Sequence, residues 1–148
     1  MTPSQPAPLV FSLPTGPLLA ASIIGPLGIG VLWLVIGGLG FSLSSGLTGL
    51  GSGVVVAVVG LACDLLVRPW KSRPATSWMN LWILHSALRI TGSIGLVILL
   101  YFATSPDPAT LLFSYLLCFL VGLAWQTTVW IGPMRKVGIP ATREQEPE

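Results

Sequence analysis

The sequence predicts an all-α polytopic membrane protein, with four transmembrane helices in two hairpins and both termini in the cytoplasm. Of its 148 residues, 53% are hydrophobic and only 8% are charged, whereas a soluble domain carries about 25% charged residues. Four apolar segments are each long enough to cross the hydrocarbon layer, which takes a helix of about 20 residues. Nearly all basic residues lie in one loop and one tail, which indicates the orientation.

The apolar segments cover residues 18–43, 47–67, 79–103 and 110–131. Lipid offers the backbone no hydrogen-bond partner, so each segment is predicted to be a helix. The breaks between them read "SLSSGLTG", "RPWKSRPATSW" and "TSPDPAT". We therefore expect an irregular proline-rich tail over 1–17, a four-helix transmembrane domain over 18–132 and a polar cytoplasmic tail over 133–148.

The basic residues outside the spans fall into two groups: Arg68, Lys71 and Arg73 in the middle loop, and Arg135, Lys136 and Arg143 in the C-terminal tail. The N-terminal tail and the other two loops contain no lysine or arginine. Because positive residues prefer the cytoplasmic side of a membrane, both termini and the middle loop are predicted to be cytoplasmic.

A stripe of small residues marks the second segment. Gly49, Gly53 and Ala57 recur every four residues, which places them on one helix face where another helix can approach closely. Two uses of this stripe remain open: packing within the first hairpin, or binding a partner membrane protein.

Polar residues mark one face of the third segment, which includes His85, Ser86 and Arg89 at helical spacing. A charge at the bilayer centre costs from about 2.5 to over 10 kcal/mol. Arg89 can extend its stem to the cytoplasmic head groups, pair with Asp64, or meet an acidic group on a partner protein. We assign Arg89 and His85 to partner binding and keep the other two arrangements open.

Asp64 lies near the cytoplasmic end of the second segment. Arg68 follows four residues later, at the spacing of a helical ion pair. His85 is expected at a similar depth on the next, antiparallel helix. Asp64, Arg68 and His85 are therefore predicted to form a structural polar cluster that locks the second and third helices together.

Several classes of function are disfavoured. The formal net charge of +2 is small and gives no clustered basic face for nucleic acid. Cys63 and Cys118 have no ligand spacing, so we expect neither a metal site nor a disulfide. The one histidine has no plausible nucleophile beside it, and "GLTGLGSG" lacks the GK[ST] ending of a phosphate-binding loop. The expectation is a non-catalytic protein without a cofactor.

Residues 18–136 resemble ATP synthase protein I, a family of small membrane proteins associated with bacterial F-type ATP synthases. The resemblance lies in the four-span plan, the glycine-rich "GLTGLGSGVVVAVVGLACDLLV", the short basic middle loop and the polar turn "HSALRITG". It implies a role in assembly or stability of the rotor ring in the bacterial inner membrane, with Arg89 facing the carboxylates of ring subunits. The fourth span has Gln126 and no acidic residue, which departs from the family pattern and weakens a magnesium site.

The alternative is a small accessory subunit of a respiratory or photosynthetic complex, which packs against larger subunits, lipids or pigments. His85 would then be a candidate axial ligand to a haem or chlorophyll. A pore is disfavoured, because no continuous polar stripe runs through the spans.

Overall fold

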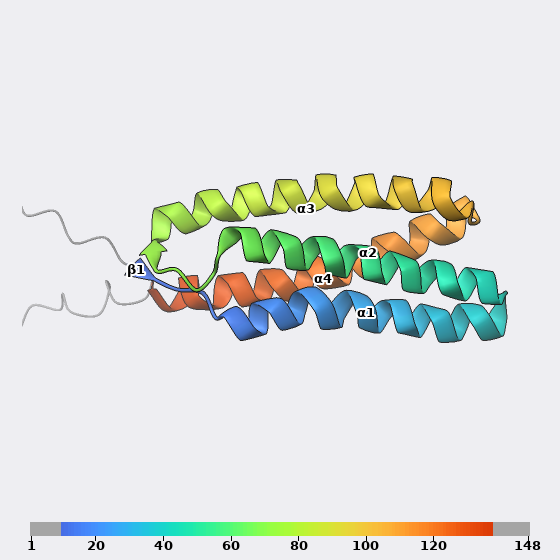
Figure 1. Cartoon of the computed structure of the whole chain (residues 1–148). Helices are drawn as coiled ribbons and strands as arrows, with labels where there is room; N and C mark the ends of the chain where they lie inside the picture. Colours follow the sequence, from blue (N-terminus) through green and yellow to red (C-terminus); the bar gives the residue numbers. More distant parts are fainter. Residues whose placement is uncertain (1–9, 138–148) are drawn as a thin grey trace, which may run out of the picture.

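The computed structural model describes residues 10–137, in which four long helices form one elongated bundle (Figure 1). Their bounds are Thr15–Gly40 for α1, Leu43–Val67 for α2, Ala75–Thr104 for α3 and Pro108–Val137 for α4. Two short antiparallel strands, β1 (Val10–Phe11) and β2 (Arg73–Pro74), pair at one end. All four helices are long and apolar enough to cross a membrane, so the all-helical fold and its four candidate spans agree with the prediction.

The turn between α1 and α2 lies earlier in the chain than predicted, at Phe41 and Ser42 rather than at residues 44–46. The Ser42 side chain accepts a hydrogen bond from the Ser45 backbone N–H at 3.1 Å and caps α2, which begins at Leu43 rather than at residue 47. Thr48 Oγ1 donates to the Ser44 carbonyl at 2.9 Å inside the first turns. The glycines and serines of this stretch signalled a loop, but helical bonding satisfies the backbone better in an apolar setting.

The start of α1 and both ends of α3 and α4 also extend beyond the predicted segments, whereas α2 ends at Val67 as predicted. Proline suits the first helical position, and α4 starts at Pro108. Just before it, the Asp107 carboxylate accepts a hydrogen bond from the Thr110 backbone N–H at 2.8 Å, and this bond holds the pKa of Asp107 below its ordinary value. At its other end α4 continues through Pro133 to Val137, so residues 133–137 are helix rather than tail. Residues 1–9 and 138–148 of the predicted tails lie outside the described residues.

Residues 10–14, predicted as part of an irregular tail, close one end of the bundle instead. β1 pairs with β2, and the Leu13 N–H donates to the Pro69 carbonyl at 3.1 Å. The Trp78 indole donates to the Phe11 carbonyl at 2.9 Å. The buried cluster beneath them contains Leu13, Leu18, Val67, Trp78 and Trp130. This cap brings the start of α1, the α2–α3 loop and the end of α4 together.

The helices do not pack equally closely. α2 lies between α1 and α3, and α4 packs against α1 and α2 (Figure 1). The backbones of α3 and α4 approach each other at few points, although the two helices are consecutive in the chain. Contact between α3 and α4 therefore depends mainly on side chains.

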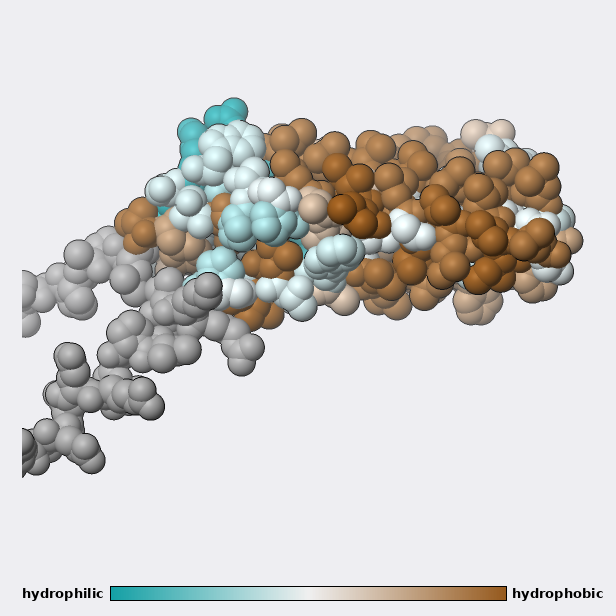
Figure 2. Space-filling view, turned by 90° about the horizontal axis from the view of Figure 1, so that it is seen from below, coloured by the Kyte–Doolittle hydropathy of each residue, from teal (hydrophilic) through white to brown (hydrophobic). Residues whose placement is uncertain are grey.

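Hydropathy divides the bundle along its length. Figure 2 shows hydrophobic residues over most of the visible surface, while hydrophilic and pale residues gather at the end that carries the α2–α3 loop. The basic residues Arg68, Lys71 and Arg73 belong to this end. The starts of α1 and α3 and the ends of α2 and α4 also meet here, as an up-and-down arrangement requires.

Candidate functional site

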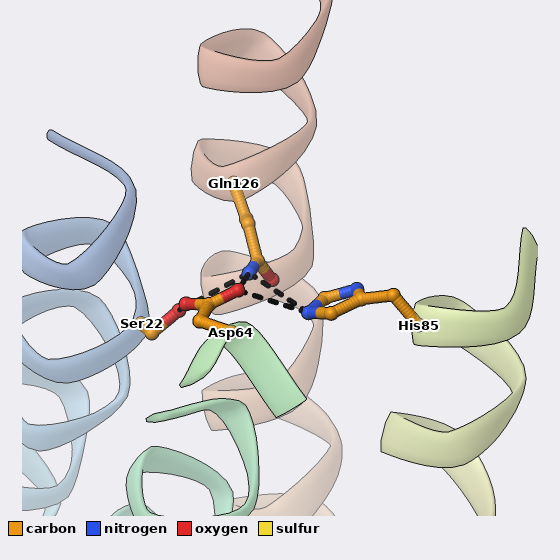
Figure 3. A network of polar contacts seen from close by, with 4 residues as sticks. All are labelled: Ser22, Asp64, His85 and Gln126. Carbon is orange, nitrogen blue, oxygen red and sulfur yellow. Dashed lines mark hydrogen bonds and ion pairs between the residues drawn. The ribbon is translucent and has the colours of Figure 1, made fainter. Parts of the chain in front are cut away.

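The candidate site is centred on Asp64 of α2, whose side chain is completely buried. Its carboxylate accepts a hydrogen bond from Ser22 Oγ of α1 and another, at 2.7 Å, from Gln126 Nε2 of α4. His85 Nε2 of α3 lies 2.9 Å from Asp64 Oδ1. Figure 3 shows these three side chains converging on the carboxylate from three different helices. We call Ser22, Asp64, His85 and Gln126 the Asp64 network; it contains one side chain from each of the four helices.

The chemistry of the network follows from its donor and acceptor roles. The oxygens of Asp64 accept the hydrogen bonds that Ser22 and Gln126 donate, and Asp64 Oδ1 accepts one from His85 when the ring carries its proton on Nε2. Hydrogen bonds to an ionised group are roughly twice as strong as neutral ones. In an apolar interior, a carboxylate without such donors would be very costly. The network therefore supplies the buried carboxyl group of Asp64 with hydrogen-bond partners and links the four helices to one another.

Arg89 lies beside this network and is 1% exposed. Its Cζ lies 5.7 Å from the centre of the Phe119 ring, within the range of a cation–π contact. Within residues 10–137, none of its three side-chain nitrogens has a hydrogen-bond partner. The guanidinium is thus enclosed by apolar and aromatic groups, with its donors unused.

Two of the three arrangements predicted for Arg89 are not found, and contact with an acidic group of a partner protein stays a prediction. The side chain is buried rather than extended to the head groups. It also makes no ion pair with Asp64, since the ion pair of Asp64 within the described residues is with His85. The reason is the rotation of α3, which turns His85 and Arg89 inward and its apolar residues outward.

Two glycines make room for this guanidinium. A Cβ on Gly122 of α4 would lie 2.8 Å from Arg89 Nη2 and 2.9 Å from Pro26 Cγ, and a Cβ on Gly60 of α2 would lie 3.7 Å from Arg89 Cζ. Gly60 precedes Asp64 by one helical turn, and Gly122 precedes Gln126 by the same spacing. Small residues and network residues therefore share one face on each of these helices.

The predicted polar cluster of Asp64, Arg68 and His85 is partly wrong. Asp64 and His85 are in contact, but Arg68 is exposed and lies outside the network. α2 ends at Val67, and Arg68 adopts the left-handed conformation with φ of 52°. A helical pair at this spacing needs the helix to continue to its second member, and here it does not.

Of the two uses left open for the stripe of Gly49, Gly53 and Ala57, the contacts of its glycines match packing within the first hairpin. A Cβ on Gly53 would lie 2.7 Å from the Pro26 carbonyl oxygen, and one on Gly49 would overlap the Trp33 side chain. Ala57 is 6% exposed. All three residues are buried, and the contacts of Gly49 and Gly53 are with α1, so the stripe serves packing inside the chain.

Further polar pairs lie deeper along the bundle. Ser93 and Tyr115 hydroxyls join α3 to α4 at 2.9 Å, and Ser52 and Ser114 hydroxyls join α2 to α4 at 3.0 Å. No group of three histidine, cysteine or acidic side chains is close enough to hold a metal ion within the described residues. Interhelical hydrogen bonding is thus the main use of polar side chains inside this bundle.

The predicted polar cluster did not include two members of the Asp64 network, Ser22 and Gln126. Gln126 carried a signal, since an amide within an apolar span usually bonds to another helix. Ser22 carried none, because a single serine in a helix interior commonly bonds to its own backbone.

Comparison with known proteins leaves the family open. No family model, no curated protein and no solved structure matches this chain.

Proposed function

We propose that this protein is a non-catalytic membrane protein that aids assembly or stability of the rotor ring of an F-type ATP synthase through helix packing. The ring is the partner that the sequence resemblance suggests. The chain would lie in the inner membrane of a bacterium, with both termini and the α2–α3 loop in the cytoplasm. Four candidate membrane spans support the multi-pass part of this proposal.

The positions of the basic residues support the orientation. Arg68, Lys71 and Arg73 belong to the α2–α3 connection, and Arg135 and Lys136 belong to the last turn of α4. Both segments are at the same end of the bundle (Figure 1). Lysine and arginine favour the cytoplasmic side, which supports a cytoplasmic position for this end.

The observation behind the packing role is the contrast between the two faces of α3. Its polar side chains Trp78, His85, Arg89 and Ser93 are buried. Its outer face exposes a row of large apolar side chains: Ile83, Leu84, Leu88, Ile90, Ile94, Ile98 and Leu99. Because α3 packs closely only against α2, this outer face is free for a helix of another protein.

The Asp64 network gives that face a fixed position. Association of helices in lipid depends on close van der Waals packing and on hydrogen bonds, so a rigid surface packs better than a mobile one. In this proposal Arg89 acts from inside the bundle, by helping to set the position of α3, and not by direct contact at the surface.

The same apolar face of α3 also suits the second candidate, an accessory subunit of a respiratory or photosynthetic complex. This second candidate does not include His85 as a ligand to a haem or chlorophyll. Nε2 of His85 is committed to Asp64, and the residue is 4% exposed. This candidate therefore rests on helix packing alone.

The test is purification of the tagged full chain in a mild detergent, followed by quantitative mass spectrometry of the co-purified proteins. Rotor-ring subunits are expected to be enriched. The double variant Leu84→Ala and Leu88→Ala on the outer face of α3 is expected to reduce that enrichment about tenfold, the equivalent of losing roughly 1.4 kcal/mol of contact. The matched control is Val31→Ala with Val35→Ala on α1, where both side chains are also about half exposed.

Enrichment of a respiratory or photosynthetic complex instead of ring subunits would replace the first candidate by the second. An equal loss with both double variants would contradict the role of the α3 face.

A further inference from the structure

A small, partly open cavity lies between α3 and α4. Its volume is about 10 Å³, and its walls include Arg89 and Ser86 of α3 and Gln126, Thr127 and Trp130 of α4. A space of this size holds one small ion or a single carboxylate oxygen, with the rest of that group in the open side of the cavity. The cavity adjoins the Asp64 network through Gln126 and His85. It is also lined by Arg89 and Trp130, which are not members of the network.

Two of the residues that line the cavity have buried hydrogen-bond donors without an acceptor. Nε, Nη1 and Nη2 of Arg89, and Nε1 of Trp130, are all buried without a partner within residues 10–137. Arg89 and Trp130 are 1% exposed each, so bulk solvent does not satisfy them. Buried donors almost always have an acceptor, and these two come from opposite walls of one cavity.

The two residues define the chemistry of the missing partner. Guanidinium and indole groups donate hydrogen bonds and accept none, so a ligand in this cavity must be a hydrogen-bond acceptor. Asp64 is the nearby acceptor, but its carboxylate is already engaged by Ser22, His85 and Gln126. The positive charge of Arg89 favours an acceptor that is itself negative.

We propose that this cavity binds one small monovalent anion, either a halide ion or a carboxylate group, through Arg89 and Trp130. The ligand accepts hydrogen bonds from both side chains and neutralises the buried guanidinium. The inference does not rest on the proposed function, since it concerns donors within this chain alone.

The packing of α3 against α4 gives the ligand a way in. The two helix backbones approach each other at few points, and Trp82, on the α3 side of the cavity, is 38% exposed. The cavity therefore reaches the surface of the bundle beside Trp82, and a small anion can enter there.

The test is thermal unfolding of the purified full chain in detergent, at constant ionic strength and pH. Sodium gluconate, whose anion is too large for the cavity, is the reference, and sodium chloride and sodium formate are the probes. The melting temperature is expected to rise with chloride or formate and to saturate, as binding to the folded state alone requires. Saturation with chloride identifies a halide site, and saturation with formate alone identifies a carboxylate site.

Variants separate this site from a general salt effect. Arg89→Gln is expected to raise the half-saturating concentration at least tenfold and Trp130→Phe about threefold, the losses expected for a charged and a neutral hydrogen bond respectively. Arg68→Gln removes an exposed arginine and leaves the half-saturating concentration unchanged.

If Arg89→Gln does not fold, excess chloride line width in ³⁵Cl NMR supplies the second measurement. Wild type is expected to show a broadened signal that bromide competes away and that Trp130→Phe weakens. Equal melting temperatures of the wild type in gluconate, chloride and formate would overturn the proposal. So would a chloride response that Trp130→Phe and Arg68→Gln leave equally intact.

Discussion

Replacement of Asp64 by alanine is expected to lower the free energy of unfolding by about 3–5 kcal/mol, the cost of leaving several buried polar side chains without their shared partner. Ser22, His85 and Gln126 would each lose their shared acceptor. Arg89 would lose the negative charge that acts on it through space. The measurement is reversible unfolding in mixed micelles of dodecyl maltoside with a rising fraction of dodecyl sulfate, followed by circular dichroism.

Two variants serve as controls for this loss. Asp64→Asn removes the charge but keeps one acceptor oxygen, so it is expected to cost less than the alanine variant. Asp107→Ala removes the other aspartate of the chain, whose carboxylate is exposed and bonds only to the start of α4. A stability of Asp64→Ala within about 0.5 kcal/mol of wild type, the range of ordinary surface substitutions, would contradict a network that joins the helices.

Replacement of Gly53 by alanine is expected to destabilise the bundle by about 1–3 kcal/mol, the usual cost of overpacking. The added Cβ would lie 2.7 Å from the Pro26 carbonyl oxygen and 3.0 Å from Gly30 Cα. Both neighbours are backbone atoms, so no side-chain rotation relieves the contact and α1 must move away from α2. The same unfolding measurement in mixed micelles detects the loss.

Gly28→Ala is the matched control on α1, because a Cβ there meets no atom within 4 Å. Alanine stabilises a helix interior by up to about 1 kcal/mol relative to glycine, so this variant is expected to be neutral or more stable than wild type. Equal destabilisation by the two substitutions would indicate that the contact between α1 and α2 is not as close as described.

Composition and apolar length were sufficient to predict the helices, because a chain with so few charges has long segments that only lipid can solvate. Their ends were not predictable from apolar length. Ser42 caps α2 inside a stretch that reads as a loop, and Asp107 with Pro108 starts α4 earlier than its apolar residues suggest. Such ends depend on single hydrogen bonds, which hydropathy does not record.

The candidate site was predictable only in part, for a similar reason. Helical spacing places His85 and Arg89 on one face of α3, and depth brings His85 to Asp64. Spacing does not indicate whether that face points into the bundle or out of it. The burial of Arg89 could therefore not be predicted without knowing how α3 packs. The Gly49 and Gly53 stripe shows the same limit: a small-residue pattern predicts a close neighbour but does not identify it as α1.

A single distance tests most directly whether the four helices meet at Asp64 within a bilayer. The chain has one histidine, so the ring nitrogens of ¹⁵N-histidine report on His85 alone. Solid-state NMR of the full chain in lipid bilayers, with ¹³C at the aspartate carboxyl carbon, measures the dipolar coupling between the two labels. Strong dephasing of Nε2 is expected, as for a nitrogen 2.9 Å from a carboxylate oxygen, and it should vanish in Asp64→Asn. No dephasing in the wild-type protein would contradict the Asp64 network.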